Sequence, residues 1–144
     1  MDKSILSFAS MSLLVFGACQ NIENKKNDPS AISAQSIAVH DEIMPQISTF
    51  DKHTVLIDSL LGNLAAVKSK DSAINTSDVR NDLTDLKAEL ESATDQMMTW
   101  MKDFEPDSAE TSYQQAQLDT ISNLKETFSK VSQNADRLLT PYKK

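Results

Sequence analysis

The stretch that decides the fold is TSDVRNDLTDLKAELESATDQMMTWMKDF, residues 76–104. Its apolar residues recur at alternating steps of four and three, and they are Val79, Leu83, Leu86, Leu90, Ala93, Met97, Trp100 and Phe104. Residues with this spacing lie on one side of an α-helix, so the pattern predicts a helix with a single apolar seam. Thr76 or Ser77 can cap its start, and Pro106 follows its end.

Two further apolar seams flank this one. The downstream seam has the same spacing and consists of Ile121, Leu124, Phe128, Val131, Ala135 and Leu138. The upstream segment, from about Pro29 to Lys68, has a broader stripe formed by Val39, Ile43, Ile47, Phe50, Ile57, Leu60, Leu61 and Leu64. Three amphipathic helices with short polar connections bury their seams most simply as an all-α, antiparallel up-down-up three-helix bundle, here residues 30–144. An intermolecular coiled coil is the alternative, because it has the same period.

Composition also indicates a helical protein. The chain of 144 residues has only two glycines and four prolines, and long helix-favouring side chains dominate the rest. Pro45 falls inside the first expected helix, where its ring removes one hydrogen bond to the carbonyl of Asp41. The sequence therefore predicts a kink in that helix.

The beginning of the chain has the three parts of a secretory signal peptide. Lys3 precedes an uncharged stretch, ILSFASMSLLVFGA, which ends in the small residues Gly17 and Ala18. The stretch is too short to span a bilayer, which needs about 20 apolar residues. Residues 1–18 are therefore expected to be removed.

The sequence VFGAC, residues 15–19, resembles the lipobox of bacterial lipoproteins, although Phe16 is bulkier than the usual leucine. The resemblance implies that the Cys19 thiol receives a diacylglyceryl group, that the chain is cut before this cysteine, and that the new amino group is acylated. Gln20 is not the aspartate that retains some lipoproteins at the inner membrane, so the resemblance favours the outer membrane. An ordinary secretory signal followed by a cysteine by chance is the alternative.

The residues after the lipobox are polar and predict a flexible tether over residues 19–29. Removal of residues 1–18 takes away Asp2 and Lys3 together and leaves the formal charge at −7. Such an acidic chain repels phosphate backbones, so nucleic acid is not expected as a partner. The expected partners are the membrane, through the lipid anchor, and a protein of the cell envelope.

Motifs of known enzyme chemistry do not occur in the sequence. It has no glycine-rich loop for phosphate and no HExxH or ExxH motif for a metal. Lipidation of Cys19 would leave no thiol to act as a nucleophile. We therefore expect no catalytic residues and a binding or structural role.

The segment VHDEIMP, residues 39–45, contains the candidate ligands for a metal. His40 and Met44 are four residues apart and share one face of the first helix. If the second helix returns along the first, Met44 comes opposite Met101 and Ile47 opposite Met98. The methionines that follow the signal then gather near His40, together with the single tryptophan.

Imidazole and thioether groups are ligands that Cu(I) prefers, and a methionine with a histidine can also hold a haem iron. The candidate metal ligands are His40, Met44, Met98 and Met101. Packing is the simpler interpretation, because methionine fills irregular gaps in a core, such as those beside a kinked helix. On that interpretation no cofactor is expected.

The run HDEIMP, followed much later by MMTWMKDF, also resembles small helical bacterial lipoproteins that sometimes carry the label "viral A-type inclusion protein". The label implies nothing viral. The resemblance implies a helical lipoprotein and no particular activity.

Overall fold

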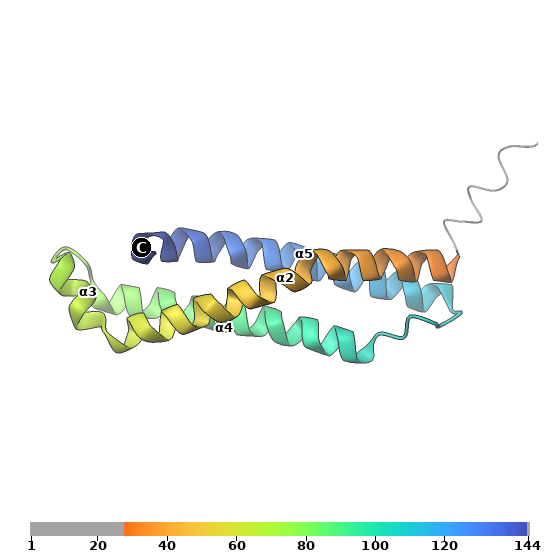
Figure 1. Cartoon of the computed structure of the whole chain (residues 1–144), viewed down its shortest axis with the longest axis horizontal. Helices are drawn as coiled ribbons and strands as arrows, with labels where there is room; N and C mark the ends of the chain where they lie inside the picture. The colour runs from red at the N-terminus through yellow and green to blue at the C-terminus, as the bar shows by residue number, and fades with distance from the viewer. Residues whose placement is uncertain (1–27, 144) are drawn as a thin grey trace, which may run out of the picture.

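The computed structural model describes residues 28–143, and all regular secondary structure in this part of the chain is helical. Its elements are α2 (Pro29–Gly62), α3 (Leu64–Lys70), α4 (Thr76–Asp103), α5 (Thr111–Leu139) and the 3₁₀ turn η1 (Thr140–Tyr142). The three long helices, α2, α4 and α5, lie alongside one another, and the short α3 lies at one end (Figure 1). The predicted signal peptide and Cys19 are outside the described residues. No helix within residues 28–143 combines the length and the hydropathy of a membrane span.

The helix predicted over residues 76–104 is confirmed as α4. The central six residues of its seam are buried and the two outer ones are half-buried. Its cap differs from the prediction, because the Asn75 side chain accepts the hydrogen bond from the Ser77 N–H at 3.0 Å. Asn75 thus satisfies one of the amide groups that a helix start leaves without a partner.

The single helix predicted from about Pro29 to Lys68 is interrupted, so the described chain has four α-helices. The break follows Gly62, a residue of low helix propensity. Asn63 ends α2 by donating its backbone N–H to the Leu60 carbonyl and its side-chain amide to the Ser59 carbonyl. Leu64, expected on the first helix, is instead buried at the start of α3.

The helix α2 bends near its middle, as Figure 1 shows, and Pro45 occupies the middle of its sequence. This agrees with the predicted kink, because proline leaves the Asp41 carbonyl without its helical partner. The helix begins at Pro29, with the Asp28 side chain accepting from the Ser30 N–H at 3.1 Å. Its start therefore includes the end of the segment predicted as a tether.

The core lies where the three long helices meet, and each of them contacts the other two. Phe50 of α2 stacks on Phe128 of α5 with ring centroids 4.8 Å apart. The last residue of the downstream seam is displaced by one position, since Leu139 is fully buried and Leu138 only half-buried. Leu138 and Leu139 follow the buried Ala135 by three and four residues, so both lie near the side of α5 that faces the core.

The loop between α4 and α5 is fastened by side chains. The buried Gln114 donates its amide to the carbonyls of Glu105, Pro106 and Ser108. Ser33 of α2 donates to the Pro106 carbonyl at 2.9 Å, so the loop is also tied to the first helix. These bonds satisfy carbonyls that the end of α4 and the turn expose.

Candidate functional site

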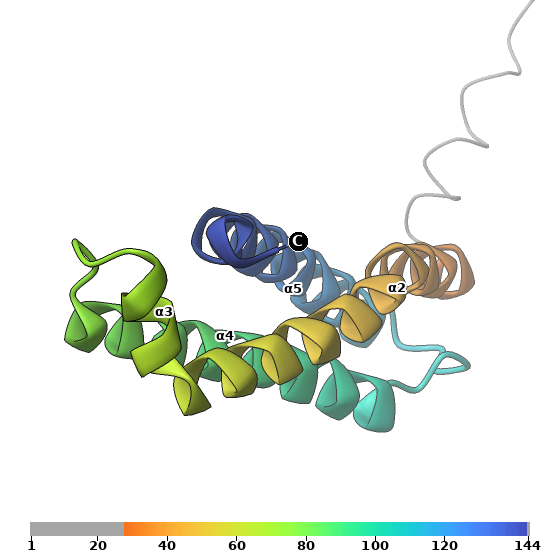
Figure 2. The same ribbon diagram turned by 60° about the vertical axis from the view of Figure 1, so that its left-hand side comes forward.

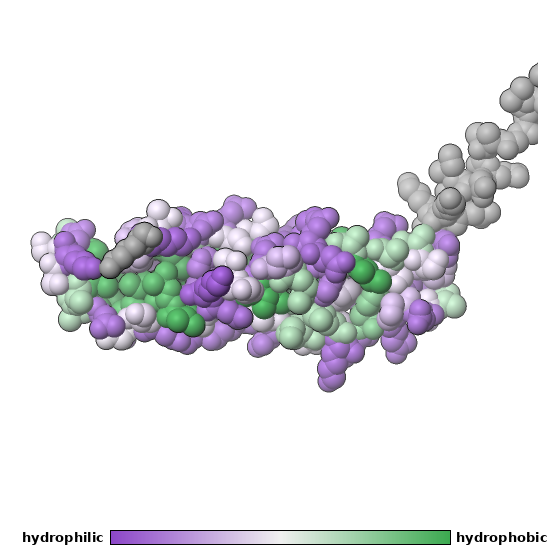
Figure 3. All heavy atoms as spheres, in the orientation of Figure 1, coloured by the Kyte–Doolittle hydropathy of each residue, from purple (hydrophilic) through white to green (hydrophobic). Residues whose placement is uncertain are grey.

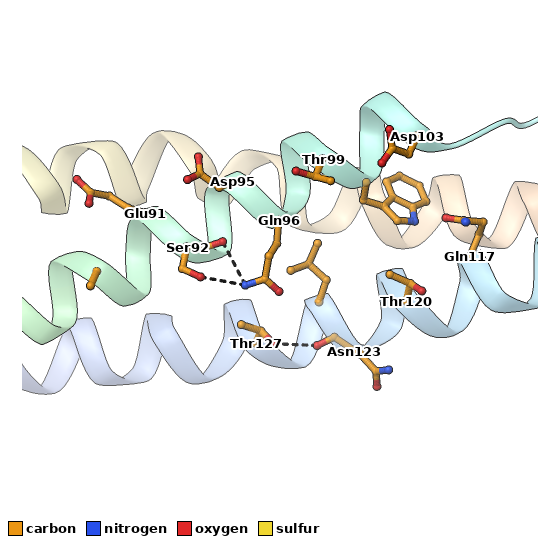
Figure 4. Close-up of a pocket in the computed structure, with 13 residues that line it drawn as sticks. Glu91, Ser92, Asp95, Gln96, Thr99, Asp103, Gln117, Thr120, Asn123 and Thr127 are labelled. Carbon is orange, nitrogen blue, oxygen red and sulfur yellow. Dashed lines mark hydrogen bonds between the residues drawn. The ribbon is translucent and has the colours of Figure 1, made fainter.

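A groove with a volume of about 810 Å³ lies between α4 and α5 (Figure 4). We call it the α4–α5 groove. Its α4 wall carries Glu91, Ser92, Asp95, Gln96, Thr99 and Asp103, and its α5 wall carries Gln117, Thr120, Asn123 and Thr127. Ala88, Trp100 and Leu124 complete the lining. The groove is thus hydroxyl- and amide-rich, with charge on one wall only.

Negative charge is the only formal charge in the groove lining. Within residues 28–143, the carboxylates of Asp95 and Asp103 have no hydrogen-bond or ion-pair partner. The side-chain amides of Gln117 and Asn123 on the opposite wall also have no partner in this part of the chain. The groove therefore offers free acceptors on α4 and both free donors and free acceptors on α5.

A second, smaller hollow shares Thr127 with the groove and continues along the same two helices. There the Asn134 amide donates to the Glu89 carboxylate at 2.7 Å, which links α4 and α5 directly. The one cationic side chain of the second hollow is that of Lys130. The free carboxylates of Asp95 and Asp103 therefore lie in the half of the α4–α5 interface nearer the loop that connects these two helices.

His40 lies against α4 in a defined orientation. Its ring stacks on Trp100 with centroids 5.7 Å apart, and Trp100 stacks in turn on Phe104 at 4.5 Å. The His40 Nδ1 lies 3.0 Å from a carboxylate oxygen of Asp41. Because a carboxylate only accepts, the proton of a neutral ring is on Nδ1 and the lone pair on Nε2. That Nε2 is buried and has no hydrogen-bond partner.

The methionines differ in burial although three of them are close in sequence. Met97 is 0 % exposed within the seam, whereas Met98 is 52 % and Met101 is 41 % exposed. Met44 of α2 is half-buried against the core. Core packing therefore explains Met97 and contributes to Met44, but it does not explain Met98 and Met101.

The ion pair between Lys87 and Asp58 shows which side of each helix these residues occupy. Lys87 of α4 binds Asp58 of α2 at 2.6 Å, so both residues lie at the α2–α4 edge. Met98 and Met101 follow Lys87 by 11 and 14 residues, close to whole turns of about 3.6 residues. Met44 precedes Asp58 by 14 residues and so shares its side of α2. The two exposed methionines and Met44 therefore line the same edge.

Two contacts between α2 and α4 bear on the level of these residues along the helices. The Asp58–Lys87 ion pair has the register that was expected for Met44 opposite Met101, whereas the His40–Trp100 contact is displaced from that register by five residues. Figures 1 and 2 show α2 crossing α4 obliquely, so the register shifts along the pair. The expected proximity of His40 and Trp100 is confirmed. We call His40, Met44, Met98 and Met101 the methionine edge.

His53, the second histidine, lies further along α2 and is half-buried. Burial lowers its pKa below the usual value, and the nearby Lys143 ammonium lowers it further, against an opposing effect of Asp136. The same Lys143 donates to Asp136 at 2.8 Å and holds the pKa of that carboxyl down. These groups are at the end of α5 and belong to neither the groove nor the methionine edge.

Sequence reasoning did not find the α4–α5 groove. Its acidic and hydroxyl residues had the pattern of a solvated helix face, which is the usual position of such side chains. The only available signal was the small size of Ala88 and Ser92, which are four residues apart on one side of α4 and line the groove. No family model, curated protein or solved structure matches the chain.

Proposed function

We propose that the protein is a lipid-anchored, non-catalytic binding module of the bacterial cell envelope. In this proposal residues 1–18 are removed, Cys19 carries the lipid, and the helices form one antiparallel up-down-up three-helix bundle. The order of the contacts along the helices supports this topology. Residues later in α2 contact earlier residues of α4, as in an antiparallel pair, whereas residues later in α2 contact later residues of α5, as in a parallel pair. The pairs are His40–Trp100, Asp58–Lys87, Glu42–Lys125 and Gln46–Ser132.

The observation that carries the binding role is the set of free polar groups in the α4–α5 groove. Asp95 and Asp103 lack cationic partners within the described chain, and Gln117 and Asn123 of α5, which belong to the same lining, have free side-chain amides. Ammonium or guanidinium groups complement the carboxylates, and peptide carbonyls and amides complement the side-chain amides. A basic polypeptide segment supplies both, so we propose that the partner is such a segment of an envelope protein.

A non-catalytic role agrees with the exposure of the groove. Both Asp95 and Asp103 are exposed, and no histidine or cysteine lines the groove. General acid–base catalysis usually depends on carboxyls whose pKa values are shifted by burial or by a close partner. Exposed carboxylates on an open wall are suited to attracting a cation.

Site-specific photo-crosslinking in cells tests the groove. A photo-reactive residue at Asn123, on the groove wall, should give one discrete cross-linked protein. The same photo-reactive residue at Glu126, exposed on α5 and outside the groove lining, should give no such product.

Asp95→Lys with Asp103→Lys should abolish the cross-link, because the change replaces electrostatic attraction of the basic segment by repulsion. Asp119→Lys with Glu126→Lys, which makes an equal charge change outside the groove, should leave it intact. A cross-link that survives the groove charge reversal would contradict the proposal.

A separate experiment tests the anchor. Cys19→Ser should leave an unprocessed or mislocalised chain that lacks the lipid mass, because the thiol is the acceptor of the diacylglyceryl group. Membrane fractionation and intact-mass measurement of both forms give the answer. Equal retention in the membrane fraction with an unchanged mass would contradict the lipoprotein assignment.

A further inference from the structure

We propose that the methionine edge, His40, Met44, Met98 and Met101, binds Cu(I). The proposal goes beyond the binding role of the α4–α5 groove, because it concerns the opposite edge of α4. The first observation is the exposure of Met98 and Met101, at 52 % and 41 %. Two large thioether side chains on the solvent side of the α2–α4 contact are not accounted for by core packing. Figure 3 shows apolar residues reaching the surface on the side where α2 lies in front.

The second observation is the free nitrogen of His40. Its Nδ1 is held by Asp41 at 3.0 Å, and its Nε2 is buried without a partner. A metal-binding histidine typically has this arrangement, in which a carboxylate fixes the tautomer through one ring nitrogen and leaves the other for the metal. A buried acceptor without a partner is otherwise costly, so a ligand for Nε2 accounts for its position.

The third observation is the level of the four side chains along the helices. Met101 is next to Trp100, which contacts the His40 ring, and Met98 is three residues earlier. At about 1.5 Å rise per residue, all four residues lie within roughly 10 Å along the axis. The proposed site requires the flexible side chains of Met44, Met98 and Met101 to bring their sulfur atoms to a common point beside Nε2.

The ligand chemistry selects the ion. Thioether sulfur with neutral imidazole favours a soft, singly charged cation, and Cu(I) is the biological ion of that class. No three histidine, cysteine, aspartate or glutamate side chains gather as metal ligands within residues 28–143, so a hard divalent ion lacks a comparable site in this part of the chain. The binding step needs no redox change, because Cu(I) enters and stays as Cu(I).

Competition against a Cu(I) chelator under anaerobic, reducing conditions tests the site. The full chain is used with Cys19→Ser in every variant, so that a free thiol does not bind the ion. Met44→Leu, Met98→Leu and Met101→Leu combined should weaken binding by at least about tenfold. Met97→Leu is the matched control, because this methionine is adjacent in sequence but faces the core, and it should leave the affinity unchanged.

Two further measurements separate ligation from loss of structure. His40→Phe keeps a ring against Trp100 while removing Nε2, and it should weaken Cu(I) binding with an unchanged circular dichroism spectrum. Ag(I), a redox-stable substitute, should shift the NMR signals of the Met44, Met98 and Met101 methyl groups and leave that of Met97 in place. Equal Cu(I) affinity of the wild type and the triple variant would overturn the proposal. An equal loss of affinity in Met97→Leu would overturn it as well.

Discussion

The two edges of α4 carry opposite chemistry although they belong to one helix. The edge toward α5 carries Asp95 and Asp103, which have no cationic partner within the described residues, in an open polar groove. The edge toward α2 carries the exposed Met98 and Met101, and Trp100 of the same helix stacks on His40 of α2. The buried seam between the two edges packs α4 against α2 and α5. The difference shows that side chains outside the seam are not constrained by core packing and can therefore serve as ligands. The packing of α2 and α5 against α4 determines which of these side chains lie close together.

The largest expected effect is the loss of the folded structure that holds both edges of α4. Leu90 is fully buried in the middle of the α4 seam. Leu90→Asp would bury a carboxylate without a partner, and we expect a loss of more than about 4 kcal/mol in the free energy of unfolding. Thermal unfolding followed by circular dichroism measures this loss. Thr84→Asp, at an exposed position of the same helix, is the control. Unchanged melting of Leu90→Asp would mean that the seam faces solvent.

The adjacent methionines sharpen the comparison between seam and edge. Met97→Ala removes a fully buried side chain and should cost about 2–5 kcal/mol. Met98→Ala removes a side chain that is half exposed and should change the stability by only about 0.5 kcal/mol. Urea denaturation of the two variants measures both values. Similar costs would show that Met98 is a core residue and would remove the reason to regard its edge as available.

A third change acts on the loop that follows the groove. Gln114 is buried, and its amide donates to three loop carbonyls. Gln114→Ala leaves the Ser108 carbonyl without a donor, while Ser33 still donates to the Pro106 carbonyl and the Ser108 N–H to the Glu105 carbonyl, and the change should cost about 1–3 kcal/mol. Amide hydrogen exchange should become faster in residues 104–110, while exchange at the methionine edge stays the same. Gln115→Ala, at the exposed neighbouring position, is the control, and equal effects of the two variants would show that Gln114 does not fasten the loop.

The smallest expected effect is a pH dependence that belongs to neither edge. Burial lowers the pKa of His53 in the folded state below its value in the unfolded chain. The unfolded chain therefore binds more protons near pH 6.5, and stability is present above that pH and is lost as the pH falls. Urea denaturation between pH 8 and pH 5 should show this loss in the wild type and a smaller one in His53→Gln. Parallel pH profiles of the two proteins would contradict the assignment to His53.

Much of the fold could be predicted from the periodicity of the sequence. The four-three spacing located α4 and all of its seam, and in α5 it missed only the exchange of Leu138 for Leu139. Pro45 indicated the bend of α2 because proline removes a hydrogen bond wherever it stands in a helix. The break after Gly62 was missed, since a single glycine in a helical pattern is often tolerated and the hydrogen bonds of Asn63 cannot be read from spacing.

The sequence by itself determined which residues share a face of their own helix, because that depends only on the number of residues per turn. It placed His40 near Trp100 and grouped the methionines at one end of the helices. Its spacing also put Met97 on the buried seam. Only the tertiary structure decided that Met98 and Met101 are exposed, and that α4 and α5 leave a groove beside Asp95. These features depend on the register and the crossing of the helices, which are set by the packing of side chains far apart in the sequence.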